Sequence, residues 1–263
     1  AGTSLDYDAV TIGINESIDT GTTIDIDAVG LTTITEPGNI DSGGAVTFGA
    51  DKSGTLKTAA NIKTSDDDVT FTNQVTLSGG DAKVLIDTTG TTSGDILFKS
   101  EVLTGGQAFT LDAGESGDIT ADKSITGGGA MTVTDGAVQQ YTGAIEVASL
   151  DIQDATDSVT LDGAVTTETS VDINSLTGKL TQNAKVTAGT SLDYDAVTIG
   201  INESIDTGTT VDIDTSGNTT TIAEAGDITA GGAVTFGADK SGTLTTAGEI
   251  TTSDDDVTFT NAV

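Results

Sequence analysis

A long internal repeat constrains this chain more than any other feature of its sequence. Residues Ala1–Thr23 recur without change as Ala188–Thr210, at an offset of 187 positions. The likeness continues to the end of the chain, since TSDDDVTFTN at Thr64–Asn73 returns at Thr252–Asn261. Self-similarity at a fixed period is the signature of repeat architectures, in which each unit packs against its neighbours. We therefore predict a repeat protein rather than a set of unrelated domains.

The two copies divide the chain into a first long repeat, residues 1–187, and the beginning of a second, residues 188–263. Differences between the copies indicate which side chains face the core. Ile62 returns as Ile250, whereas its neighbour Lys63 becomes Thr251. A constant apolar residue beside a variable polar one is typical of a strand, whose side chains alternate between two faces.

The second copy has one extra residue near its threonine run, Thr219–Thr221 against Thr32 and Thr33. A one-residue shift inside a strand would exchange its buried and exposed faces. We therefore expect the extra residue in a loop or a bulge. The nearby change of Val29 and Leu31 to Ser216 and Asn218 places that segment in a turn.

Short triplets with the pattern apolar, polar, apolar follow one another along the whole chain. Examples are Val46-Thr47-Phe48, Val69-Thr70-Phe71 and Val159-Thr160-Leu161. Most are bounded by glycine, aspartate, asparagine or serine, which is typical of short β-strands joined by tight turns. No stretch sustains the periodicity of an amphipathic helix. The sequence therefore predicts an all-β chain with essentially no α-helix.

Spacing and composition then favour one all-β architecture. Aromatic residues make up only 3% of the chain and tryptophan is absent, which suits a narrow core of stacked aliphatic side chains. We predict a parallel β-helix, or β-solenoid, in which Val69, Phe71, Val159 and Leu161 point into the core. The alternative is a string of β-sandwich modules. Immunoglobulin-type modules, however, repeat at about 100 residues, whereas the repeat in this chain has an offset of 187 positions.

The charge of the chain limits its partners. Acidic residues number 41 against 9 basic residues, which gives a formal net charge of −32. We therefore expect no binding to nucleic acid, and we expect either divalent cations or high salt to offset the repulsion of such a surface. No apolar run reaches the length of about 18 residues that a membrane helix requires, so we expect no membrane insertion. Cysteine and histidine are absent, which removes thiol chemistry and the commonest proton shuttle.

Two clusters of three aspartates are the sharpest charged motif. They are Asp66, Asp67 and Asp68, and their copies Asp254, Asp255 and Asp256. One interpretation is a calcium site at a turn, built from carboxylates and backbone carbonyls. The other is a solvated turn before a strand, since adjacent carboxylates repel one another. The pairs Asp6/Asp8 and Asp25/Asp27 are further candidates, because stacking of coils would turn them into ladders of carboxylates.

Other short motifs have simpler explanations. The glycine clusters Gly105-Gly106 and Gly127–Gly129 lack the lysine of a phosphate-binding loop, and we expect tight turns with positive φ there. Tyr7 and its copy Tyr194 lie between aspartates, where each either offers an exposed contact or covers a strand edge.

Two long stretches carry a resemblance to a known family. They are GGQAFTLDAGESGDITADKSITGGGAMTVTDGAVQQYTGAIEVASLDI at Gly105–Ile152, and GDITAGGAVTFGADKSGTLTTAGEITTSDDDVTFTNAV at Gly226–Val263. Both resemble the repeats of large secreted bacterial proteins of the filamentous haemagglutinin type. The resemblance implies a right-handed parallel β-helix on an exported, surface-associated or released protein.

We therefore expect an extracellular or cell-surface structural repeat protein, not an enzyme: a stiff acidic stalk, filament or coat segment, with an adhesive role as an extension. The chain begins with alanine and ends inside a repeat, so we expect a piece of a longer protein. Expected partners are further repeats or identical chains, divalent cations and cell-surface glycans, and calcium is the one candidate cofactor. The alternatives are a calcium-binding adhesin of tandem β-sandwich modules and a polysaccharide-acting β-helix enzyme that uses paired carboxylates.

Overall fold

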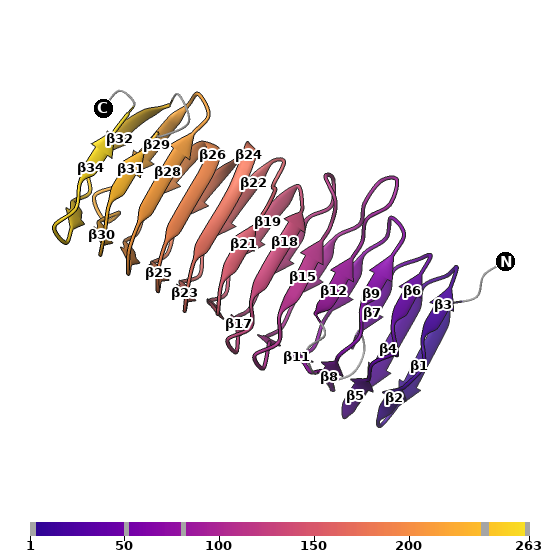
Figure 1. Cartoon of the computed structure of the whole chain (residues 1–263). Helices are drawn as coiled ribbons and strands as arrows, with labels where there is room; N and C mark the ends of the chain where they lie inside the picture. Colours follow the sequence, from indigo (N-terminus) through magenta and orange to yellow (C-terminus); the bar gives the residue numbers. More distant parts are fainter. Residues whose placement is uncertain (1–3, 50–52, 80–82, 238–241, 261–263) are drawn as a thin grey trace.

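The chain winds into a parallel β-solenoid of about 12 coils, as the computed structural model shows (Figure 1). The structure describes residues 4–49, 53–79, 83–237 and 242–260; the repeat residues Ala1–Thr3 and Asn261 lie outside them. No helix occurs in these described ranges. The winding is of the right-handed type. The two ends of the chain lie at opposite ends of an elongated body (Figure 1).

Each coil contributes one strand to each of three faces, and every strand pairs in parallel with the strand of the next coil. The first face contains β1 (Leu5–Ala9), β4 (Ile24–Ala28), β7 (Val46–Phe48), β10 (Val69–Phe71), β13 (Ile96–Phe98), β16 (Ile119–Ala121), β19 (Val138–Tyr141), β22 (Ser158–Leu161), the second halves of β24 (Val171–Gln182) and β26 (Leu192–Ile201), β29 (Thr219–Ile222) and β32 (Thr243–Thr246). The second face contains β2 (Ile12–Ile14), β5 (Leu31–Ile34), β8 (Thr55–Thr58), β11 (Val75–Leu77), β14 (Val102–Leu103), β17 (Ile125–Thr126), β20 (Ile145–Val147), β23 (Val165–Thr167), β25 (Val186–Ala188), β27 (Ile205–Thr207), β30 (Ile228–Ala230) and β33 (Ile250–Thr252). The third face contains β3 (Ile18–Thr20), β6 (Ile40–Ser42), β9 (Ile62–Thr64), β12 (Val84–Asp87), β15 (Phe109–Asp112), β18 (Met131–Asp135), β21 (Leu150–Ile152), the first halves of β24 and β26, β28 (Val211–Thr215), β31 (Val234–Phe236) and β34 (Val257–Phe259).

One apolar core runs along the axis because alternate side chains of every strand point inward. Val69, Phe71, Val159 and Leu161 are all fully buried, which confirms the predicted inward positions. The core extends without interruption from Ile14 in the first coil to Leu244 in the last. The prediction of a β-solenoid is thus confirmed, and the alternative of separate β-sandwich modules is wrong.

Stacking of like residues on successive coils strengthens this core. The ring of Phe71 lies between those of Phe48 and Phe98, with centroid distances of 5.2 and 4.8 Å and nearly parallel planes. Offset stacking of this kind contributes about 0.5–1.5 kcal/mol per pair beyond the burial of area. The narrow core therefore accommodates a column of stacked aromatic rings, because three successive coils each place a phenylalanine at the same position.

The two copies of the repeat lie on different faces of the solenoid. In the first copy the segment LDYDA is β1, in the first coil of the first face, where it pairs with β4. In the second copy the same segment is the first half of β26, in the ninth coil of the third face, where it pairs with β28. The long repeat therefore spans eight complete coils and two further faces. Since each coil has three faces, two steps forward equal one step back, and the second copy is rotated by one face about the axis.

Local conformation is conserved through this rotation. Gly49 and its copy Gly237 have φ values of 73° and 71°, and Asp66 and its copy Asp254 have φ values of 70° and 83°. Of the predicted glycine turns, Gly105 and Gly106 have positive φ, and so do Gly127 and Gly128. Turn geometry thus follows local sequence wherever the segment is placed around the axis.

The extra residue of the second copy lies in the turn between β28 and β29, as the prediction of a loop requires. The prediction of a turn over the Val29–Leu31 segment is correct for Val29 and wrong for Leu31. Leu31 begins strand β5, where it pairs with Thr55. The insertion shifts the alignment by one residue, so the structural counterpart of Leu31 is Thr219, which begins β29 and pairs with Thr243.

Candidate functional site

The aspartate clusters predicted to bind calcium lie in turns that precede the strands β10 and β34. Asp66 Oδ1 accepts hydrogen bonds from the backbone N–H groups of Thr92 and Ser93, at 2.5 and 3.2 Å. Asp68 Oδ1 accepts from the N–H of Asp95 at 2.8 Å, while Asp67 is exposed. These carboxylates therefore tie one turn to the turn of the next coil.

Asp254, Asp255 and Asp256 lie in the last coil and are exposed. The structure does not bring them together with Asp66–Asp68. Within the described ranges, no group of three or more acidic side chains is arranged to hold a metal ion. Calcium binding at either cluster stays a prediction, and the solvated-turn interpretation accounts for the contacts seen at Asp66 and Asp68.

A relay of aspartates continues from the first cluster along the edge of the first face. Asp68 Oδ1 accepts from the N–H of Asp95, Asp95 Oδ1 accepts from the N–H of Asp118 at 2.9 Å, and Asp118 Oδ1 accepts from the N–H of Val138 at 3.1 Å. Each of the three aspartates directly precedes a strand. In the sequence, this relay appears as an aspartate directly before an apolar triplet. The pattern indicates a relay only once the coils are aligned, because the aspartates are far apart along the chain.

Two ladders of polar side chains, all of them carboxyl groups except Asn174, follow the strands of the third face. In the longer one, Asp172 lies between Asp151 and Asp193, and Asp193 is followed by Asp212. Asn174, Asp195 and Asp214 form the second ladder, two residues further along the same strands. Neighbouring strands in a sheet lie about 4.8 Å apart, which fixes the spacing of the rungs. The first copy has the same ladders on the first face, where Asp6 pairs with Asp25 and Asp8 with Asp27.

One member of the longer ladder, Asp193, has a pKa near neutral pH. Partial burial of its carboxyl group, together with the charges of Asp172, Asp195, Asp212 and Asp214, raises the pKa of Asp193 to about 7. Burial also raises the pKa of Asp172, with the charges of Asp151 and Asp195 adding to it. A stack of like charges favours shared protons because each ionised rung makes the next harder to ionise.

A second acidic region is a surface hollow of about 430 Å³, to which Asp112, Glu115, Asp135 and Asp154 contribute. Burial raises the pKa of Asp135, and the charge of Asp154 raises it further. Burial raises the pKa of Asp112 as well. Asp112 and Asp135 lie in register with Asp87 of the preceding coil, and the Nζ of Lys63 lies 2.9 Å from Asp87 Oδ2.

The two tyrosines that the sequence marked as candidate contacts differ completely. Tyr7 is 37% exposed at the N-terminal end of the solenoid, whereas its copy Tyr194 is 0% exposed. Tyr194 donates its hydroxyl proton to Gln182 Oε1 at 3.4 Å. The hypothesis of an exposed contact is therefore wrong for Tyr194, because the coil that contains β24 covers it.

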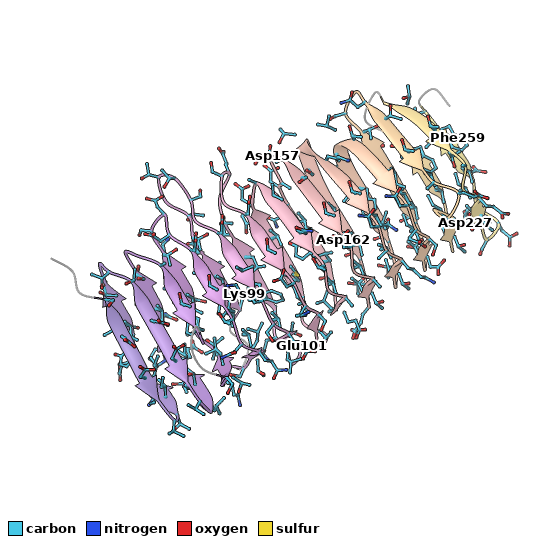
Figure 2. The ribbon with its side chains drawn as sticks, turned by 180° about the vertical axis from the view of Figure 1, so that it is seen from behind. Lys99, Glu101, Asp157, Asp162, Asp227 and Phe259 are labelled. Atoms are coloured by element: carbon cyan, nitrogen blue, oxygen red, sulfur yellow. The ribbon has the colours of Figure 1, made fainter. Side chains whose placement is uncertain are left out.

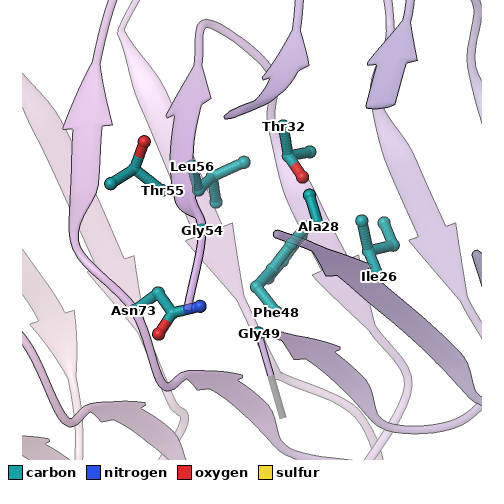
Figure 3. A pocket seen from close by; sticks show the side chains of 9 residues that line it. All are labelled: Ile26, Ala28, Thr32, Phe48, Gly49, Gly54, Thr55, Leu56 and Asn73. Atoms are coloured by element: carbon teal, nitrogen blue, oxygen red, sulfur yellow. The ribbon is translucent and has the colours of Figure 1, made fainter. Parts of the chain in front are cut away.

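A small pocket lies between the first and second faces near the N-terminal end (Figure 3). Ile26, Phe48, Leu56 and Asn73 are among its lining residues, and its volume is about 10 Å³. A cavity needs roughly 10–15 Å³ to hold one water molecule, so this one has no room for an organic ligand.

The exposed side chains form an acidic surface along the rod (Figure 2). Glu101, Asp157, Asp162 and Asp227 are all exposed; Asp157 and Asp162 flank β22, whereas Glu101 and Asp227 lie on other coils along the axis (Figure 2). In the described ranges, no helix is long and apolar enough to cross a membrane. Comparison with protein-family models, with curated proteins and with solved structures gave no match.

Proposed function

We propose that this chain is a structural spacer, a stiff acidic rod that forms part of an extracellular stalk, filament or surface coat. The observation that carries the proposal is the single uninterrupted core, with parallel pairing at every step from β1 to β34. In a rod of this kind each coil contacts only its neighbours, so length is added by adding coils.

The rotation of the second copy supports a spacer over a localised active site. Ala1–Thr23 and Ala188–Thr210 are identical in sequence, yet the structure places their strands on different faces. A catalytic cleft depends on residues that several strands bring together at one place. A sequence repeated at two angles around the axis serves a function that tolerates any angle.

The acidic charge of the chain governs how rods approach one another. A net charge of −32 keeps rods apart at low ionic strength. Divalent cations or salt would reduce this repulsion, and the carboxyl ladders of the third face are the surface on which cations would gather. The likeness to filamentous haemagglutinin-type repeats supports export to the cell surface, where glycans are candidate partners.

Small-angle X-ray scattering together with distance measurements between dyes near the two ends would test the spacer proposal. Twelve coils at about 4.8 Å each predict a rod about 55 Å long, with a narrow distribution of end-to-end distances. A broad distribution that varies with salt would contradict the proposal. Release of reducing sugar from a panel of neutral polysaccharides would replace it with the polysaccharide-acting enzyme.

A further inference from the structure

Three short sequences of the form Asn-x-Ser/Thr occur in the chain. They are Asn15-Glu16-Ser17, its copy Asn202-Glu203-Ser204, and Asn218-Thr219-Thr220. This pattern marks asparagines to which sugars are attached in secreted proteins, where the asparagine lies in a surface loop. A pattern this short also arises by chance in a threonine-rich chain. Its meaning therefore depends on where the fold places the three asparagines.

Each of the three asparagines is exposed in a turn between two strands. Asn15 lies between β2 and β3, Asn202 between β26 and β27, and Asn218 between β28 and β29. Asn202 directly follows β26, whose second half is paired on one side with β24 and on the other with β29. It is exposed although coils lie on both sides of it. The exposure of this turn is thus a property of the turn itself.

The three turns lie at three different corners of the solenoid, where one face gives way to the next. Asn15 lies between the second and third faces, Asn202 between the first and second, and Asn218 between the third and first. Asn15 and Asn202 are copies of one another, and only the rotation of the second copy by one face places them at different corners. Groups attached to the three side chains would project in three directions and leave the flat faces uncovered.

Asn218 is the extra residue that distinguishes the second copy from the first. The first copy reads VGL over Val29–Leu31, and the second reads SGNT over Ser216–Thr219. Val29 is 55% exposed and Leu31 is 41% exposed. The insertion and the changes beside it therefore replace an exposed apolar turn with a polar turn, and the inserted asparagine completes an attachment sequence.

The contacts of Asn202 and Asn218 are compatible with an attached sugar. Asn202 donates one of its two Nδ2 protons to Asn183 Oδ1 at 2.7 Å, so the amide keeps a second proton that a sugar can replace. At Asn218 the backbone carbonyl accepts a hydrogen bond from the N–H of Thr243 at 2.9 Å. This bond holds the turn to the next coil while the Asn218 side chain is exposed.

We propose that Asn15, Asn202 and Asn218 are attachment sites for sugars, so that the rod carries glycans at its three corners. This inference deepens the proposed function and rests on it, because the Asn-x-Ser/Thr pattern is used in secreted proteins. In the reaction, the anomeric carbon of the sugar breaks its bond to the diphosphate of an activated donor and bonds to Nδ2. One Nδ2 proton is released, and the diphosphate leaves. The product is a bulky, solubilising surface group.

The burial of Thr220 determines when Asn218 can be modified. The hydroxyl group of the third residue is part of the recognised pattern, yet Thr220 is only 3% exposed. Thr220 pairs with Ile199 of the preceding coil and with Leu244 of the next. An enzyme can therefore reach the complete pattern at Asn218 only before these coils close. Attachment at this site precedes folding.

Glycans at the corners would keep rods apart under conditions in which charge no longer does so. The screening length falls from about 14 Å at 0.05 M salt to about 4 Å at 0.5 M, so the repulsion between acidic rods weakens as salt is added. A bulky hydrated group acts through its volume, which salt does not change. Light scattering in about 0.5 M NaCl should therefore show more lateral association after enzymatic removal of the sugars than before. Equal association before and after removal would contradict this role of the glycans.

Mass spectrometry of the chain exported by its own cells tests the attachment directly. The chain has no arginine, and trypsin should release Val186–Lys240 because no lysine lies between these residues. This peptide contains both Asn202 and Asn218, and fragmentation assigns a sugar to one or the other. We expect sugar on both asparagines. Exported chain without sugar on either of them would overturn the proposal.

Matched variants separate the attachment pattern from the asparagine alone. Thr220→Val removes the buried hydroxyl group and should abolish the sugar at Asn218, whereas Thr220→Ser should retain it. The sugar at Asn202 is the internal reference, since it reports that each variant is exported. Lys185→Thr completes the pattern at Asn183, which is exposed at the same corner as Asn202, and should add a sugar there. Sugar that persists at Asn218 in Thr220→Val would overturn the assignment.

The order of folding and attachment gives a readout that chance occurrence of the pattern would not produce. A sugar-free chain that is first folded and then incubated with an extract of the same cells should stay unmodified at Asn218. A peptide that spans Val211–Ala230 should be modified in the same extract. Equal modification of the two would overturn attachment before folding. The outcomes are separable from the proposed function: a stiff rod without sugar refutes only the attachment, whereas sugar on a flexible chain refutes only the spacer.

Discussion

The first coil of each copy contains the same residues, and only their surroundings differ. Leu5–Ala9 pairs with one strand, β4, whereas Leu192–Ala196 pairs with β24 below and β28 above. Tyr194 is consequently buried and Tyr7 half-exposed. Side-chain burial in this fold is therefore set by the presence of a neighbouring coil, not by the strand itself. Four pairs of copies allow this conclusion to be tested one residue at a time.

The largest difference is expected between Phe71 and its copy Phe259. Phe71 stacks on rings at both sides, whereas Phe259 stacks on Phe236 alone, at 5.4 Å. Phe71→Ala should lower the free energy of unfolding by about 4 kcal/mol, and Phe259→Ala by about 1 kcal/mol. Urea denaturation followed by far-UV circular dichroism measures both. Equal losses would mean that the end coil is already covered in solution.

Tyr194 and Tyr7 should differ by somewhat less. Tyr194→Ala removes a fully buried ring and should cost about 3 kcal/mol, while Tyr7→Ala should cost below about 1 kcal/mol. Tyr194→Phe isolates the hydrogen bond to Gln182 and should cost about 1 kcal/mol. The comparison is made by chemical denaturation in low salt. A costly Tyr7→Ala under those conditions would contradict the assignment of an open N-terminal edge.

Asp193 should make the stability of the chain depend on pH, because carboxyl groups of neighbouring coils surround it. The pKa of Asp193 is raised from 3.8 to about 7 by burial and by surrounding carboxylates. Because the folded chain then binds the extra proton, this contribution to stability is fully present below pH 3.8 and is lost as the pH rises through about 7. Asp193→Asn should therefore raise the melting temperature above that of the unmodified chain. This increase should be larger at pH 8 than at pH 5. Asp6→Asn is the matched control, and an identical profile for the two variants would refute the ladder effect.

The smallest effect is expected at Lys63, which the second copy replaces with Thr251. Lys63→Thr removes a partly exposed ion pair with Asp87, whose Nζ to Oδ2 distance is 2.9 Å. Such pairs contribute between about 0.2 and 1 kcal/mol. The loss should shrink further in about 0.5 M NaCl, because salt screens the attraction. A loss above about 2 kcal/mol would show that the pair supports the neighbouring acidic ladder as well.

Much of the fold could be predicted from the sequence because the decisive signal is local. The alternation in Val69-Thr70-Phe71 decides which side chains enter the core without reference to any other strand, and both Val69 and Phe71 are buried as predicted. Glycine and aspartate at the turns decided where strands end. The inward-facing Gln139 and Gln182, both fully buried, were missed, since their polarity hides them from a search for apolar alternation.

The aspartate ladder of the third face and the aspartate relay could not be predicted from any single stretch of the sequence. Asp151, Asp172, Asp193 and Asp212 form a ladder only because the strands of successive coils stack in register. The carboxyl ladders of the first copy were predicted from the closely spaced pairs Asp6/Asp8 and Asp25/Asp27, which pair across β1 and β4. The relay from Asp68 through Asp95 to Asp118 required the alignment of three separate turns.

The sequence by itself determined that this protein is a repeat, that it is all-β and which side of each strand faces the core. These properties follow from neighbouring residues, because side-chain direction alternates along a strand whatever lies beside it. Only the tertiary structure decided that the second copy is rotated by one face, and that Tyr194 is buried while Tyr7 is not. Those properties depend on how much chain each coil consumes and on which coil lies next, and both are settled only when all the coils stack together.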